Sequence, residues 1–284
     1  MWPFSSRPTV PVLRLFGPIG LATPLRPGLS ISTLAGPLDR AFSLSKLPAV
    51  ALIVNSPGGS AVQSNLILKR IRQLAEEKKK KVYVFCEDVA ASGGYYIAVA
   101  GDEIYADASS IVGSIGVIAA GFGFDRAIER LGIDRRVYTA GQSKSILDPF
   151  KPEKQEDVAR IKAIQEDIHD VFIGVVKDRR AGRLRGTDTE MFNGSFWSAP
   201  KAHDLGLIDG VTDIRTKMRE LYGENVALRV IPIGPTGLLS RLRRLPGMST
   251  GDTLAPSSFG TWAGLGDELV STIEARSLWS RYGL

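Results

Sequence analysis

Two short apolar runs constrain the fold of this chain more than any other feature. Residues 50–54 (VALIV) and 82–86 (VYVFC) contain only apolar side chains, which is typical of strands covered on both faces within a parallel sheet. Between them, Ile67, Ile71, Leu74 and Ala75 recur at helical spacing. Strand, helix and strand in this order predict an α/β architecture built from repeated strand–helix units.

The same alternation continues along the chain. Ser60 and Gln63 form a capping-box pattern at the start of the helix between the two runs. In residues 153–180, apolar residues at helical spacing predict a long helix with a buried stripe: Val158, Ile161, Ile164, Ile168, Val171, Phe172 and Val175. We expect further strands at residues 12–16, 103–106, 115–119, 136–139 and 196–198, and further helices at 34–44, 92–99, 124–131 and 199–205.

The composition changes after residue 231. Residues 246–266 are rich in Gly, Ser, Thr and Pro, as in a flexible linker. We therefore expect one large α/β domain at residues 1–231 and a C-terminal extension at 232–284. A terminal helix at 267–282 would either dock on a neighbouring subunit or belong to a mobile tail.

Three polar or glycine-rich segments form a candidate catalytic site. Gly58 and Gly59 follow the first apolar run, Ser92 opens a helix after the second, and Lys144 lies in a polar loop. A serine hydroxyl needs a base to become a nucleophile, and burial can turn a lysine amine into that base. Free backbone N–H groups at the glycine turn could stabilise an oxyanion. Each segment alone also fits a structural role: a tight turn, a helix cap or a solvated lysine.

Residues 55–59 (NSPGG), 91–98 (ASGGYYIA) and 112–117 (VGSIGV) together resemble the signal peptide peptidase A family in its short bacterial form. The resemblance extends from about Val50 to Asp209. It implies an α/β fold of the ClpP/crotonase type, assembled as an oligomeric ring. It also implies a serine endopeptidase that cleaves short or unfolded peptides, such as signal-peptide remnants, through an acyl-enzyme.

The resemblance assigns a role to each candidate residue. Ser92 would be the nucleophile and Lys144 the general base. Ser114 would orient the lysine amine, and the N–H groups of Gly59 and Gly93 would form the oxyanion hole. In this family the serine and the lysine come from adjacent protomers, so we expect a homo-oligomer with a shared active site.

Two other functions stay open from the sequence. A crotonase-like acyl-CoA enzyme uses a similar oxyanion hole, and a non-catalytic ring scaffold would need none of these side chains. A Ser-His-Asp triad is disfavoured, because the only histidines are His169 and His203, and both fall within predicted helices.

Composition limits which metals, cofactors and macromolecules we expect this chain to bind. Cysteine, histidine and carboxylate residues lack metal-ligand spacing, so we expect no metal and no cofactor. The single cysteine, Cys86, lies in an apolar run and fits a buried hydrophobic position. The net charge is +6, and the basic run at 78–81 has no interleaved aromatic residues, so we expect no nucleic acid. No transmembrane segment or signal peptide is evident, which predicts a cytoplasmic protein or one in peripheral contact with a membrane.

Overall fold

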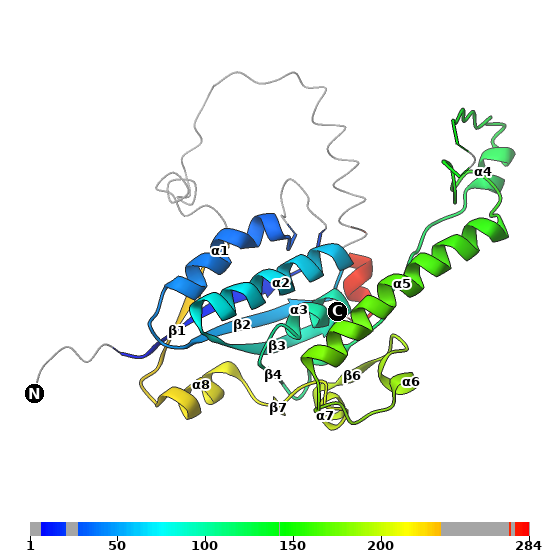
Figure 1. Cartoon of the computed structure of the whole chain (residues 1–284). Helices are drawn as coiled ribbons and strands as arrows, with labels where there is room; N and C mark the ends of the chain where they lie inside the picture. Colours follow the sequence, from blue (N-terminus) through cyan, green and yellow to red (C-terminus); the bar gives the residue numbers. More distant parts are fainter. Residues whose placement is uncertain (1–6, 21–27, 142, 234–272, 274–275, 284) are drawn as a thin grey trace, which may run out of the picture.

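The computed structural model describes residues 7–20, 28–141, 143–233, 273 and 276–283. Strands and helices alternate along these residues, as the sequence predicts (Figure 1). In chain order the elements are β1 (Thr9–Phe16), α1 (Ile31–Ser43), β2 (Ala49–Ser56), α2 (Ala61–Lys78), β3 (Lys81–Ala91), α3 (Gly93–Ala98), β4 (Glu103–Ala106), β5 (Ile111–Gly113), α4 (Asp125–Arg130), α5 (Gln155–Arg179), α6 (Asp188–Met191), β6 (Phe196–Ser198), α7 (Ala199–Asp204), β7 (Gly210–Val211), α8 (Ile214–Tyr222) and β8 (Ala227–Ile231).

One sheet forms the centre of the described chain, and it confirms the predicted α/β fold. Its strand order is β6-β5-β3-β2-β1-β8, and β4 pairs with both β3 and β7. The pairings are parallel except that between β5 and β6. The long strand β3 pairs first with β4 and then, through its last three residues, with β5. The carboxyl ends of β2 and β3 therefore meet at one edge, where α/β folds place ligands.

Helices cover both faces of the sheet (Figure 1). Every residue of β2 is buried, and alternate side chains enter two different cores. Leu52 and Val54 belong to the core beneath α1 and α2, whereas Ala51 and Ile53 pack with Met218 of α8. Burial on both faces explains why this strand contains no polar residue before Asn55.

Helix α5 is anchored to the body at only one end. Near its C-terminus, Phe172 and Val176 are buried. The buried Arg180 guanidinium follows, donating hydrogen bonds to the Gly206 carbonyl (2.8 and 3.0 Å) and to the Asp209 carboxylate (2.8 Å). The N-terminal part of α5 extends away from the body together with α4 (Figure 1). We call residues 119–164, which include this part of the helix, the arm.

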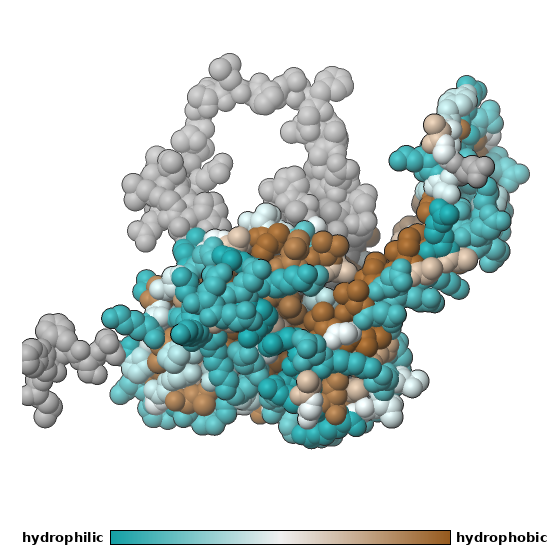
Figure 2. Space-filling model, in the orientation of Figure 1, coloured by the Kyte–Doolittle hydropathy of each residue, from teal (hydrophilic) through white to brown (hydrophobic). Residues whose placement is uncertain are grey.

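The prediction of a buried stripe along α5 is wrong for the single chain. Of the seven predicted residues only Phe172 is buried, while Ile164 is 46% exposed and Val171 56% exposed. The helix runs past the edge of the sheet, so the described residues provide no element to cover this face. Figure 2 shows the resulting apolar surface along α5 and on the adjoining part of α2.

Several predicted local features are also wrong. Residues 115–119 form no strand, because Gly113 and Ser114 adopt positive φ angles (116° and 54°) and turn the chain after β5. Residues 136–139 form no strand either, since no described strand lies beside this part of the arm. Ser60 does cap α2, but the Gln63 side chain accepts a hydrogen bond from the Ile31 N–H (2.9 Å) instead of completing the capping box.

Most of the C-terminal extension lies outside the described residues, so the division at residue 231 remains a prediction. Residues 276–280 are helical, and this segment contacts the body of its own chain. Trp279 lies against Phe16, with ring centroids 6.0 Å apart, and Tyr282 contacts Phe196 edge-on at 5.1 Å. Tyr282 is buried in a small cluster with Val89 of β3. This docking brings the terminal helix next to the carboxyl end of β3.

None of the described helices has the length and apolar character needed to cross a membrane.

Candidate active site

Ser92 occupies the sharp turn between β3 and α3. Its φ and ψ angles are 52° and −122°, a strained combination for a residue with a side chain. Ser92 occupies the N-cap position of α3, but its hydroxyl makes no capping hydrogen bond to the helix. The Ser92 N–H donates to the Gly113 carbonyl (2.8 Å), which fixes the backbone while the half-buried side chain lines a pocket.

The glycine turn after β2 packs directly against this serine. Gly58 and Gly59 have φ angles of 106° and 139°, which side chains rarely allow. A Cβ atom on Gly58 would lie 2.8 Å from the Ser92 Cβ, and one on Gly59 would lie 2.1 Å from the Ile19 carbonyl oxygen. Glycine is thus required at Gly58 for the turn to approach the serine, and at Gly59 for the turn to pack against Ile19.

Two backbone donors are free beside the serine. The N–H groups of Gly59 and Gly93 donate no hydrogen bond to another described residue, and Gly93, as the first residue of α3, has no intrahelical acceptor. The two residues are close, since a Cβ atom on Gly93 would lie 3.3 Å from the Gly59 nitrogen. Free donors at the mouth of a pocket can stabilise a developing oxyanion.

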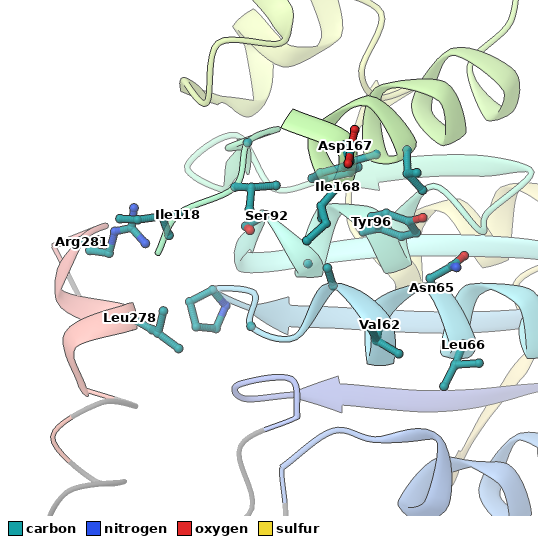
Figure 3. A pocket seen from close by; sticks show the side chains of 18 residues that line it. Val62, Asn65, Leu66, Ser92, Tyr96, Ile118, Asp167, Ile168, Leu278 and Arg281 are labelled. Carbon is teal, nitrogen blue, oxygen red and sulfur yellow. The ribbon is translucent and has the colours of Figure 1, made fainter. Parts of the chain in front are cut away.

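A pocket of about 590 Å³ opens beside Ser92 (Figure 3). It lies between α2, α3 and α5, and apolar side chains dominate its wall. The Tyr96 hydroxyl is buried without a hydrogen-bond partner among the described residues, and burial raises the pKa of this phenol. The lining residues are Pro57, Gly59, Ala61, Val62, Asn65, Leu66, Ser92, Gly93, Tyr96, Gly116, Val117, Ile118, Asp167, Ile168, Val171, Phe172, Leu278 and Arg281.

The segment that follows β5 begins with Ser114 and is contacted by a histidine of α5. Ser114 comes directly after Gly113, the acceptor of the Ser92 N–H, and its own N–H donates to the Ser195 carbonyl (2.7 Å). His169 donates through Nε2 to the Ile115 carbonyl (3.0 Å), which agrees with a structural role. These bonds hold residues 114–118 along one wall of the pocket.

Lys144 is separate from this arrangement. It lies in the arm between α4 and α5, its side chain is exposed, and it does not line the pocket. The chain therefore brings Ser92, Gly59 and Gly93 together, but not the predicted base.

Sequence reasoning did not identify the rest of the pocket. Tyr96 could have been found, because it lies four residues after Ser92 and so on the same face of α3. Arg281 could not, since nothing in the sequence indicates where the terminal helix docks. Among the described residues, no three His, Cys, Asp or Glu side chains are grouped so as to hold a metal ion.

Comparison with known proteins identifies the family. Residues 74–226, more than half of the chain, match the model of peptidase family S49. The chain belongs to peptidase family S49. This confirms, at the level of the family, the resemblance seen in the sequence.

Individual relatives match over different lengths. The chain is 53% identical, over 97% of its length, to a protein of Brucella abortus (strain 2308) named Na(+)/H(+) antiporter NhaA, of which it spans 37%. It is 33% identical to the chloroplastic serine protease SPPA of Arabidopsis thaliana, over 66% of this chain and 30% of the relative. A solved structure of a mutant 1510-N membrane-bound stomatin-specific protease with a substrate peptide superposes with a TM-score of 0.49 at 19% identity, covering 94% of this chain and 98% of the other.

Proposed function

We propose that this S49 domain is a Ser-Lys endopeptidase whose active site is completed between two copies of the chain. One observation carries the proposal. The nucleophile turn, the free backbone donors and the pocket lie together in the body, whereas Lys144 is exposed on the arm. A neighbouring body could receive the arm and bring this lysine to its own Ser92.

The chemistry follows from these positions. The Lys144 amine of one copy would take the proton of the Ser92 hydroxyl of the next, and Oγ would attack the substrate carbonyl carbon. The oxyanion would accept hydrogen bonds from the Gly59 and Gly93 N–H groups. On collapse of this intermediate, the lysine would return the proton to the leaving amine. Water, activated by the same amine, would then hydrolyse the acyl-enzyme.

Ser114 would orient the base. It follows the residue that binds the Ser92 backbone, and its hydroxyl could accept a hydrogen bond from the lysine amine. Held in this way, the amine would direct its lone pair at the serine proton.

The pocket favours an apolar substrate side chain. Val62, Leu66, Ile168 and Phe172 contribute to its wall, and burial of an apolar side chain there is favourable. Short or unfolded peptides, such as remnants of signal peptides, have the extended backbone and apolar residues that this pocket would accept.

The exposed apolar surface supports a homo-oligomer. Besides the apolar face of α5, the arm exposes Phe122 (80%), Leu131 (72%) and Tyr138 (92%). Monomeric proteins rarely expose extended apolar surfaces such as the one along α5. A head-to-tail contact, arm on body, would repeat from copy to copy and close into a ring.

The Brucella relatives suggest where the domain works. Nearly two thirds of those proteins lie outside the matched segment, while this chain contains the S49 match and none of its described helices could cross a membrane. We infer that the antiporter name describes the unmatched part. Such an arrangement supports a peptidase that works at a membrane surface.

A subunit-mixing experiment tests the shared site. Ser92→Ala and Lys144→Ala should each abolish cleavage of an apolar fluorogenic peptide without unfolding the protein. Mixing the two inactive variants under conditions of subunit exchange should restore partial activity, because some contacts then pair an intact serine with an intact lysine. If mass spectrometry shows exchange and no activity returns, the site is not shared.

A further inference from the structure

The docked C-terminal helix contributes a cation to the pocket. Leu278 and Arg281 line it together with Ser92, although they are almost two hundred residues away in the sequence. In Figure 3, Ser92 lies between Arg281 on one side and Tyr96 on the other. We propose that Arg281 is a specificity-determining residue, which favours peptides carrying a carboxylate close to the scissile bond, on the side of Ser92 away from Tyr96.

The position of this arginine is set by two aromatic anchors. Tyr282 is only 9% exposed and packs among Val89 and Ala91 at the end of β3, one residue before the nucleophile. Trp279 contacts Phe16 at the end of β1. With these rings on the body, Leu278 of the helix and Arg281 of the turn that follows it border the pocket.

The charge of Arg281 has no partner in the described part of the chain. Its guanidinium makes no hydrogen bond or ion pair with any described residue, and among those residues it is the only lysine or arginine lining the pocket. The acidic residue of the lining, Asp167, lies near Tyr96 on the other side of Ser92 (Figure 3). A guanidinium binds carboxylates through two parallel hydrogen bonds. The carboxylate could be the C-terminus of a short peptide or the side chain of an aspartate or glutamate.

The inference rests on the proposed peptidase function and adds a substrate preference to it. Because Arg281 is exposed, solvent and salt screen its charge. We therefore expect a preference of about fivefold in kcat/KM, which weakens as the salt concentration rises.

Matched peptides test the preference. All peptides share one apolar residue before the scissile bond. The two peptides of the first pair end shortly after this bond, one with a free C-terminus and the other with an amidated one. The two peptides of the second pair carry either an aspartate or an asparagine shortly after the bond. We expect the wild-type protein to favour the free acid, the aspartate peptide or both, which also distinguishes the two carboxylate sources. Arg281→Ala should abolish the preference and Arg281→Glu reverse it, mainly through KM. The control Arg276→Glu changes an exposed residue of the same helix that does not line the pocket, and should keep the preference.

Two results would overturn the proposal. One is that Arg281→Ala changes kcat/KM equally for charged and neutral peptides. A shift of the pH profile in the same variant would show that the arginine acts on the base. The other is an unchanged preference in both Arg281 variants. As a second route, Tyr282→Ala should release the helix and abolish the preference while neutral peptides are still cleaved. Cleavage that persists in Ser92→Ala would instead refute the peptidase proposal itself.

Discussion

The backbone N–H of Ser92 donates a hydrogen bond to the carbonyl oxygen of Gly113 at 2.8 Å. This bond links the turn after β3 to the turn after β5. Ser92 and Ser114 both have φ angles above 50°, so each turn stores backbone strain next to the bond that joins them. Two strained serines held in this way form a rigid site, in which the proposed nucleophile and the proposed base-orienting hydroxyl have fixed relative positions.

Ser114→Ala should lower kcat/KM by roughly tenfold to a hundredfold, less than the loss in Ser92→Ala, because Ser114 positions the base and carries no proton. Steady-state cleavage of a fluorogenic peptide measures both. Ser114→Gly is the control for the backbone, since glycine adopts the positive φ without strain. Recovery of full activity in the glycine variant would show that the hydroxyl is not needed.

Gly58→Ala should abolish activity and destabilise the fold by about 1–3 kcal/mol. The new Cβ would lie 2.8 Å from the Ser92 Cβ and 2.9 Å from the Gly93 nitrogen, so either the nucleophile or an oxyanion donor has to move. Gly174→Ala is the matched control, because a Cβ there meets nothing within 4 Å and alanine favours a helix. Urea unfolding measures the stability of the two variants, and cleavage of a fluorogenic peptide measures their activity. Normal activity in Gly58→Ala would contradict the close approach.

Strong local patterns predicted much of the fold and part of the site. The apolar runs at 50–54 and 82–86 became the central strands β2 and β3, since strands covered on both faces need continuous apolar residues. The turns carrying Gly59 and Ser92 were predicted from their glycine-rich motifs, and they meet in the structure because the carboxyl ends of neighbouring parallel strands lie at one edge of the sheet. These features depend on interactions within short segments or between adjacent strands.

The rest depends on contacts that local sequence does not encode. The stripe along α5 has a helical period, but periodicity does not say whether the covering surface belongs to the same chain. The short edge strand β8 pairs with β1 from the other end of the domain, and Tyr282 docks beside β3. Such pairings between distant segments are decided by the whole fold.

The Cys86 thiol should resist modification in the folded protein. Burial raises its pKa to about 12 from an ordinary value near 9. The unfolded state therefore loses the thiol proton first, so the contribution of Cys86 to stability is full below about pH 9 and declines as the pH rises toward 12. Urea midpoints measured from pH 8 to 11 should fall more for the wild-type protein than for Cys86→Ala. Rapid reaction of the folded protein with a thiol reagent at pH 8 would contradict this burial.

Ile164→Glu should weaken assembly by at least about tenfold and abolish peptide cleavage, while leaving the far-UV circular dichroism unchanged. Ile164 lies on the uncovered apolar face of α5 and is 46% exposed in the single chain, so a glutamate costs the isolated fold little. If the neighbouring copy covers this face, the same carboxylate would be buried without a partner, which is strongly unfavourable. Lys162→Glu introduces the same side chain two residues earlier, on the opposite side of the helix, and should assemble normally. Analytical ultracentrifugation measures the oligomeric state of both variants. An intact, active oligomer in Ile164→Glu would exclude this face of α5 from the contact that completes the active site.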